Sequence, residues 1–151
     1  MKTLNTFIQN IQNNYKNDMK LIDIKYIIND YNGTDWKKYV KINDIKYNRN
    51  SIFKNNVFEV VIITWKKEQN VGIHRHPSRG CLFKILQGEM SEKVYNKSND
   101  TYILKEENFY KKNQVSYIED SIGYHSVENV NNDTTVSLHI YSPPFDSKCF
   151  N

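Results

Sequence analysis

The residues of this sequence best suited to metal chemistry are its histidines. His74 and His76 stand two residues apart in a stretch with the composition of a β-strand, where alternate side chains leave on the same face. Two imidazoles on one face can converge on one ion, and His125, at the start of a later strand-like stretch, can supply a third nitrogen. A His-x-His pair alone more often belongs to a surface or a core, so its surroundings decide.

The spacing around these histidines favours the metal site. The histidine pair is followed by four residues and Cys81, and then by six residues and Gly88. This is the spacing of the first cupin motif, with Cys81 in the place of its usual glutamate. His125-x-x-x-Asn129 resembles the end of the second cupin motif. Two half-motifs in this order on a β-rich chain predict a metal-binding cupin.

Three longer segments resemble the cysteine dioxygenase type I family, whose members are cupin thiol dioxygenases. They are residues 81–88 (CLFKILQG), 117–129 (YIEDSIGYHSVEN) and 136–146 (VSLHIYSPPFD). The last segment is the most specific, and the resemblance extends over nearly the whole chain, including Tyr47-Asn-Arg49-Asn. It implies a cupin barrel, with one iron(II) ion per chain, that oxidises L-cysteine with O2 to L-cysteine sulfinic acid.

The resemblance makes His74, His76 and His125 the iron ligands. Three neutral imidazoles leave iron(II) its full double charge, whereas a site with two histidines and a carboxylate is already partly neutralised. A substrate that arrives as a thiolate then supplies the anionic ligand itself, so this ligand set suits a thiol. Arg75 stands where the family usually has an acidic residue, and strand alternation predicts that it points away from the ion.

Arg49 corresponds to the arginine with which the family binds the carboxylate of its substrate. A guanidinium can hold a carboxylate by two parallel hydrogen bonds, which would fix the amino acid with its sulfur and amine turned towards the iron. The alternative is an ordinary surface arginine, but the position of Arg49 just before the first long strand favours the substrate clamp. Tyr47 is expected in the wall of the same site.

Ser137, His139 and Tyr141 alternate along one predicted strand, so their side chains point the same way, opposite to Leu138 and Ile140. Polar side chains inside a barrel need partners, and a Ser–His–Tyr chain of hydrogen bonds would satisfy them. The resemblance implies that the Tyr141 hydroxyl reaches the bound substrate and oxygen and that His139 orients Tyr141. We therefore expect His139 near the iron but not among its ligands.

Cys81 and Tyr141 correspond to the two residues that many eukaryotic family members join in a thioether, formed by the enzyme's own iron and oxygen. Bacterial relatives commonly have glycine at the cysteine position, so the presence of both residues favours the cross-linking branch. The resemblance thus implies a Cys81–Tyr141 thioether as a protein-derived cofactor. The alternative is that Cys81 is a small buried side chain with no chemical role.

Hydrophobic periodicity predicts the elements that must position these residues. Over about residues 1–44, apolar side chains recur at helical spacing, which predicts short α-helices. Over about residues 45–151, short runs of β-branched and aromatic residues alternate with turn residues. We therefore expect one mainly β domain over residues 1–151, a cupin (double-stranded β-helix or jelly-roll) barrel preceded by short N-terminal helices. The predicted strands are Val57–Trp65, Gly72–His76, Cys81–Leu86, Met90–Tyr95, Thr101–Leu104, Val115–Ile118, His125–Asn129 and Val136–Tyr141.

Composition argues against several other classes of protein. The net charge is +4, but the lysines are scattered, so nucleic-acid binding is not expected. No apolar run approaches membrane-spanning length, and the first ten residues lack the apolar region of a signal peptide. Two cysteines, Cys81 and Cys149, make no disulfide framework and predict a reducing, cytoplasmic location. We expect a monomer whose partners are the small molecules L-cysteine and O2.

Two other functions compete with this interpretation. One is a dioxygenase for another small thiol, such as 3-mercaptopropionate or cysteamine. Arg49 argues against cysteamine, which has no carboxylate, and Cys81 argues mildly against the branch that oxidises 3-mercaptopropionate. The other is a non-catalytic cupin that only binds a metal, which the presence of every expected site residue disfavours.

Overall fold

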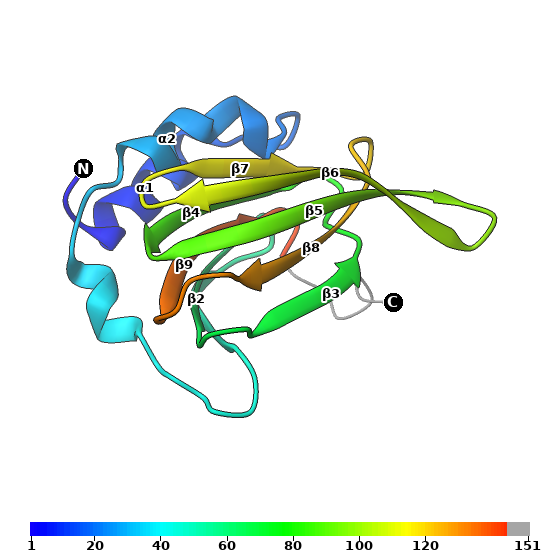
Figure 1. Cartoon of the computed structure of the whole chain (residues 1–151). Coiled ribbons are helices and arrows are strands. Elements are labelled where there is room, and N and C mark those ends of the chain that lie inside the picture. The colour runs from blue at the N-terminus through cyan, green and yellow to red at the C-terminus, as the bar shows by residue number, and fades with distance from the viewer. Residues whose placement is uncertain (145–151) are drawn as a thin grey trace.

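The structure, a computed structural model, describes residues 1–144, so Cys149 and the Phe145-Asp146 end of the family-like segment lie outside the described residues. The helical part comes first along the chain and the strands follow (Figure 1). The helices are α1 (Leu4–Asn14), η1 (Leu21–Ile24, 3-10), α2 (Lys25–Asp30) and η2 (Asp35–Tyr39, 3-10). The strands are β1 (Asn48–Lys54), β2 (Glu59–Trp65), β3 (Asn70–His74), β4 (Cys81–Gln87), β5 (Glu89–Ser98), β6 (Thr101–Lys111), β7 (Val115–Ile118), β8 (Tyr124–Asn129) and β9 (Thr135–Tyr141).

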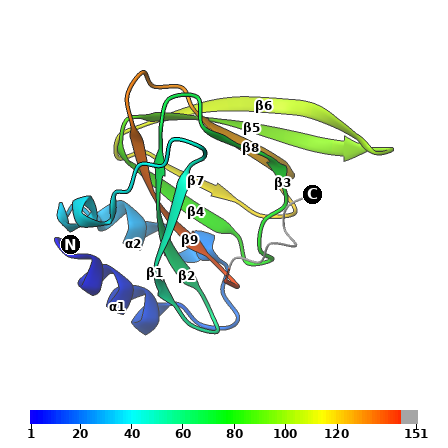
Figure 2. The same cartoon turned by 90° about the horizontal axis from the view of Figure 1, so that it is seen from below.

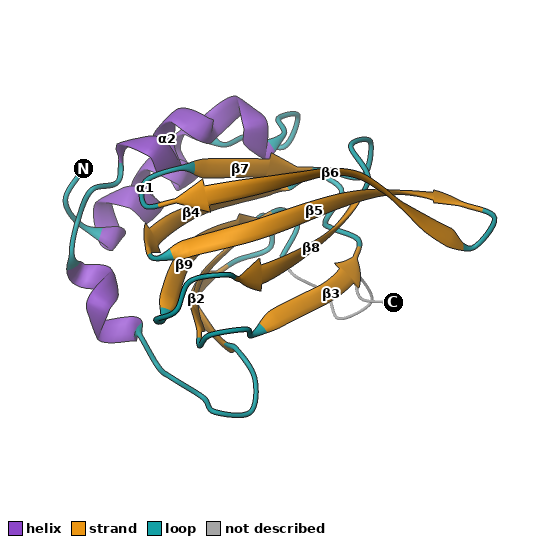
Figure 3. Ribbon diagram, viewed as in Figure 1, coloured by secondary structure: helices purple, strands orange, loops and turns teal. Residues whose placement is uncertain are grey.

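Two antiparallel sheets face each other to form the barrel. One has five strands in the order β1-β2-β9-β4-β7, and the other has four in the order β3-β8-β5-β6. The helices lie against the outer face of the five-stranded sheet, as the view in Figure 2 and the colours of Figure 3 make plain. The predicted fold class, a mainly β cupin barrel with N-terminal helices, is confirmed.

Strands β2 and β9 are buried on both faces because the helices cover one face and the second sheet covers the other. Along β2, Val60 and Ile62 pack against the helices, while Val61 and Ile63 face the barrel interior. This explains why the strand reads as an unbroken apolar run and not as an alternating one. Two layers of side chains thus hold the central strands in place, and the interior layer is the one that can carry a site.

Lys84 ties the helical layer to the central sheet. Its side chain leaves β4 on the helix side and is only 3% exposed. Its ammonium group donates to the backbone carbonyls of Ile28, Asn29 and Tyr31 at 3.1, 2.9 and 2.7 Å. A cation at the C-terminal end of α2 satisfies carbonyls that the short helix leaves without partners and interacts favourably with its dipole.

The strand predictions differ from the structure at β1, β3 and β6, and β6 runs from Thr101 to Lys111 where the prediction ended at Leu104. Strand β1 was not expected, because its polar sequence NRNSIFK lacks the period of a half-buried strand. Strand β3 ends at His74, so His76 does not share a strand with it as predicted. Pro77 follows His76, and a proline has no backbone N–H to continue a ladder. Within residues 1–144, no helix is long and apolar enough to cross a membrane.

Candidate active site

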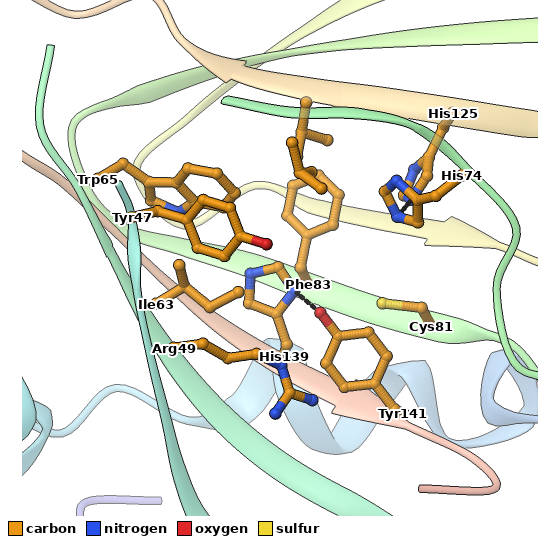
Figure 4. Close-up of a pocket in the computed structure, with 12 residues that line it drawn as sticks. Tyr47, Arg49, Ile63, Trp65, His74, Cys81, Phe83, His125, His139 and Tyr141 are labelled. Carbon is orange, nitrogen blue, oxygen red and sulfur yellow. Dashed lines mark hydrogen bonds between the residues drawn. The ribbon is translucent and has the colours of Figure 1, made fainter. Parts of the chain in front are cut away.

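A pocket opens between the two sheets and gathers side chains from six strands and the segment before them (Figure 4). Every predicted site residue lines it except His76 and Ser137. The lining residues are Tyr47, Arg49, Ile63, Trp65, Val71, His74, Cys81, Phe83, His125, Val127, His139 and Tyr141. Polar groups that are far apart in sequence therefore meet on an otherwise apolar wall, which is typical of a small-molecule site.

His74 and His125 form the closest pair of predicted metal ligands. They stand in register on the antiparallel strands β3 and β8, and their Nε2 atoms are 2.8 Å apart. His74 Nδ1 donates to the Gly72 carbonyl at 2.8 Å, and His125 Nδ1 donates to the Glu92 carboxylate at 2.7 Å. In the neutral rings each Nε2 atom then carries a lone pair, and both lone pairs meet in one gap. A proton shared by the two rings, or a cation bound to both, can bridge these atoms.

His76 lies next to this pair although it falls outside strand β3. Its ring stacks on that of His125, with centroids 5.1 Å apart and planes at 12°. The ring is buried, and neither of its nitrogens has a hydrogen-bond partner among residues 1–144. Asp120 lies 4.0 Å from its Nδ1, beyond hydrogen-bond distance, and also pairs with the exposed Arg75, which points away from the site as expected. The nitrogens of this buried imidazole are therefore available to bind a metal ion.

Burial sets the charge of these histidines. Desolvation, followed by the neighbouring His125, lowers the pKa of His74 to about 3. The same two causes, followed by His74 and Arg75, lower the pKa of His76 to about 3. Both rings are therefore neutral near pH 7, which is the protonation state in which imidazole binds a metal.

These donors fit a divalent transition metal in their chemistry. As the side chains stand, no three His, Cys, Asp or Glu residues of the described chain form a complete metal-binding arrangement. However, two bare Nε2 atoms share one gap, and a third buried imidazole beside them lacks partners. Imidazole suits iron and other first-row metals, and the Nδ1 hydrogen bonds of His74 and His125 fix the tautomer that presents Nε2.

A second polar chain crosses the pocket on strand β9. Trp65 Nε1 donates to Ser137 Oγ at 2.9 Å, and Ser137 in turn lies 2.7 Å from His139 Nε2. His139 Nδ1 lies 3.2 Å from the Tyr141 hydroxyl. The Trp65 N–H can only donate, so Ser137 Oγ accepts from it. When Ser137 gives its own proton to His139 Nε2, the Nδ1–H of His139 donates to the Tyr141 hydroxyl. The expected hydrogen-bond contacts from Ser137 through His139 to Tyr141 are present. Trp65 on β2 adds a fourth member to the chain, which was not predicted.

Burial also controls protonation along this chain. Desolvation, followed by the positive charge of Arg49, lowers the pKa of His139 well below its usual value. Desolvation, followed by Cys81, raises the pKa of Tyr141 well above its usual value. His139 is therefore neutral and Tyr141 is a phenol near pH 7, so the tyrosine hydroxyl keeps a proton with which to contact a bound molecule.

Cys81 and Tyr141 are neighbours across strands β4 and β9, where they pair in register. The Cys81 side chain is buried and is not part of a disulfide. Burial, followed by the charge of Glu92, raises the pKa of the thiol, while a hydrogen bond with Tyr141 opposes the shift. The two side chains that the predicted thioether would join are therefore adjacent and in contact.

Arg49 reaches the same end of the pocket from strand β1. Its guanidinium carbon lies 5.3 Å from the centroid of the Tyr141 ring. Its Nη2 and Nη1 atoms contact the two carboxylate oxygens of Glu59 at 3.1 and 3.5 Å, and Glu59 is only 3% exposed. Tyr47 stands beside it, with its ring 4.8 Å from that of Trp65. The predicted clamp residue therefore lines the pocket, held by a buried carboxylate.

Two carboxylates of the site, Glu59 and Glu92, were missed by the sequence interpretation. Glu59 is the first residue of β2 and is buried like the apolar residues after it. Glu92 lies on β5 between the buried Met90 and Val94, on the same face by alternation. A charged residue in such a position is a signal that the sequence does carry. Their partners could not have been found, because Arg49 and His125 approach them only through the fold.

The sequence of the chain is similar to one family of known proteins. The family model "Cysteine dioxygenase type I" matches residues 1–150. The zebrafish protein named "Cysteine dioxygenase type 1" is 32% identical over 155 residues, which cover 97% of this chain and 77% of the relative. The human protein of the same name is 38% identical over 119 residues, covering 76% of this chain. That match spans 60% of the length of the human relative.

Comparison with solved structures supports the fold alone, because the identities are low. The structure of TT1209 from Thermus thermophilus has a TM-score of 0.63 at 17% identity and covers 74% of this chain and 97% of its own. A cupin superfamily protein from Desulfitobacterium hafniense has a TM-score of 0.55 at 12% identity, covering 74% and 90%. Both agree with the two-sheet barrel described above.

Proposed function

The chain belongs to the cysteine dioxygenase type I family, and from this premise we propose that it is an iron(II)-dependent enzyme that oxidises L-cysteine with O2 to L-cysteine sulfinic acid. The observation that carries the proposal is the pair of Nε2 atoms, 2.8 Å apart, in a pocket that also holds Arg49 and Tyr141. The pocket combines donors for a metal with groups that suit an amino acid.

In this proposal His74, His76 and His125 hold one iron(II) ion per chain. When bound, iron(II) supplies open coordination positions and the redox chemistry by which O2 reacts with a thiol. The contribution of the protein is neutral nitrogen donors that leave the ion its charge, so that a substrate thiolate completes the site. The Nδ1 hydrogen bonds to Gly72 and Glu92 keep two of these rings oriented.

Arg49 would bind the carboxylate of L-cysteine. A guanidinium has more N–H donors than one carboxylate can use, so pairing with Glu59 is compatible with a second carboxylate. The Glu59 contact holds the side chain of Arg49 beside the ring of Tyr141, where it lines the pocket. Tyr47 would close the wall next to it. A cysteine anchored in this way presents its sulfur to one position, which lowers the entropic cost of reaction.

Tyr141 would contact the reacting atoms through its hydroxyl. The oxygen of this group accepts a hydrogen bond from His139, so its own proton remains available to a partner in the pocket. Because the pKa of Tyr141 is raised by burial, the group stays protonated and acts as a donor. Ser137 and His139 would serve this purpose by fixing the direction of the hydroxyl.

The Cys81–Tyr141 thioether is part of the proposal. A bond would form between Cys81 Sγ and a carbon of the tyrosine ring, with loss of the thiol hydrogen and one ring hydrogen. The two electrons and two protons removed pass to O2, which the proposed reaction already uses. Register pairing of the two residues supports this reaction because no backbone movement is needed to bring them together.

The remaining expectations also stand as proposals. We propose that residues 1–151 make one domain that works as a cytoplasmic monomer on the small molecules L-cysteine and O2, without nucleic-acid or membrane partners. The scattered lysines support the absence of a nucleic-acid partner. The family-wide match over residues 1–150 supports a single domain.

A second candidate is the oxidation of a small thiol without a carboxylate, such as cysteamine. The Arg49–Glu59 ion pair supports this candidate, because Glu59 already balances the positive charge of Arg49. The pocket therefore does not require a carboxylate on the substrate. Purified protein loaded with iron(II) and supplied in parallel with L-cysteine, 3-mercaptopropionate and cysteamine separates the two. The proposal expects the largest kcat/KM with L-cysteine, and a preference for cysteamine would replace it with the second candidate.

A further inference from the structure

Glu92 is a buried carboxylate that touches the proposed iron site through one of its ligands. It lies on β5 and is 2% exposed. Its Oε2 atom accepts from His125 Nδ1 at 2.7 Å, and its Oε1 atom accepts from the Ser116 hydroxyl at 2.8 Å. His125 and Ser116 are buried as well. Both carboxylate oxygens are thus engaged by protein groups in a site away from solvent.

The charge of Glu92 needs a counter-charge. Within residues 1–144, His125 is the one basic group that makes an ion-pair contact with this carboxylate. Burying an ionised carboxylate is costly unless a positive charge offsets it, and a neutral imidazole supplies a hydrogen bond but no charge. A proton shared with His74, or a cation bound at the opposite nitrogen of the ring, Nε2, can supply the charge. The Nε2 atom of His74 lies 2.8 Å from this nitrogen, so the same cation has a second donor.

We propose that Glu92 is a positioning residue of the metal site, and that its buried negative charge strengthens the binding of a divalent cation by His74 and His125. It holds His125 with the proton on Nδ1 and the lone pair on Nε2. This inference deepens the proposed function and depends on it, since it takes His125 as a ligand of iron. Carboxylates placed behind a ligating histidine typically change metal affinity by about 10- to 100-fold.

Glu92→Gln tests the role of the charge. Glutamine can still accept the hydrogen bond from His125 Nδ1, so the ring keeps its orientation while the negative charge is lost. The matched control is Glu59→Gln, the same substitution at the other buried carboxylate of the site, which pairs with Arg49 and not with a predicted ligand. The metal dissociation constant is measured by anaerobic titration of the metal-free protein with iron(II), and again with zinc(II) as a redox-inert probe.

The proposal expects Glu92→Gln to bind both ions about 10- to 100-fold more weakly than the unaltered protein, with Glu59→Gln unchanged. Equal affinity of Glu92→Gln and the unaltered protein would overturn it. So would a loss of stability of the metal-free variant at unchanged affinity, since Glu92 would then be only structural. Failure of the unaltered protein to bind either ion would overturn the proposed iron site itself, so the two failures are distinguishable.

A measurement on the unaltered protein keeps the test decisive if Glu92→Gln does not fold. In the zinc(II)-loaded protein labelled with ¹⁵N, two-bond correlations of the imidazole rings report which nitrogen carries the proton. The proposal expects a His125 ring that is protonated on Nδ1 and bound to zinc through Nε2. A ring bound through Nδ1, or without a proton there, would contradict the role given to Glu92.

Discussion

Cys81 and Tyr141 stand directly opposite each other across the antiparallel strands β4 and β9. Residues paired in this way have Cβ atoms about 4.5–5.5 Å apart. On its other side Tyr141 is paired with Glu59 of β2, the carboxylate that contacts Arg49. Strand β9 therefore places one tyrosine between the cysteine to which it would be joined and the ion pair that would bind the substrate.

The first prediction follows from this pairing. After incubation of the iron(II)-loaded protein with L-cysteine and O2, we expect a peptide that contains both Cys81 and Tyr141 and is lighter than their sum by two hydrogen atoms. Mass spectrometry of a proteolytic digest measures it. The variants Cys81→Ser and Tyr141→Phe should show no such peptide. Sustained turnover with both residues still separate would rule out the cross-link.

Substrate binding gives the second prediction. Arg49→Gln should raise the KM for L-cysteine about tenfold to a hundredfold, because hydrogen bonds to charged groups contribute about 1.5–3 kcal/mol. Steady-state kinetics of sulfinate formation measure it. The single variant also removes the partner of the buried Glu59, so Arg49→Gln combined with Glu59→Gln is the matched control. If KM is unchanged in both variants, Arg49 does not bind the carboxylate.

The third prediction concerns pH and His139. The ring is buried and its pKa is well below 6.5 in the folded state, so the unfolded chain binds a proton that the folded chain does not. The free energy of unfolding of the metal-free protein should therefore fall as pH falls below about 6.5, by about 1.4 kcal/mol per pH unit for this group.

His139→Gln removes that proton-binding group and should make the dependence of stability on pH shallower. Denaturant unfolding at several pH values between about 5 and 7.5 measures the slope, in a range where most carboxyl groups stay ionised. An equal slope in the variant and the unaltered protein would mean that His139 is protonated in the folded state, which would contradict its place in the Ser137–His139–Tyr141 chain.

The fourth prediction separates the fold from the site. Lys84→Met should destabilise the protein by about 2–4 kcal/mol, because two buried carbonyls and one part-buried carbonyl lose a charged donor. Thermal or denaturant unfolding measures the loss. Lys84 lies on the helix side of β4, so the affinity for metal should be unchanged under conditions where the variant is folded. Weakened metal binding in the folded variant would show that the helical layer supports the site.

The sequence was sufficient for the fold and for most of the pocket because both leave local signals. The β-rich segments with their turns and the alternation of Ser137, His139 and Tyr141 depend only on the period of a strand. The structure agrees with that alternation, since Leu138 and Ile140 pack on the helix side and the three polar residues on the other.

What the sequence could not supply depends on contacts between distant segments. Strand β1 is held by its pairing with β2, and its own residues show no strand period. Strand β3 ends at His74, shortly before Pro77, which has no backbone N–H to continue a ladder. The partners of Glu59 and Glu92 are determined by sheet register, which no single segment encodes.

The central claim is tested most directly by following O2 consumption and product formation in one experiment. Purified protein is loaded with iron(II) and given L-cysteine in air-saturated buffer, while O2 uptake and L-cysteine sulfinic acid are measured together. The proposal predicts one O2 consumed for each sulfinate formed. Uptake that yields only cystine, or no uptake with iron demonstrably bound, would contradict it.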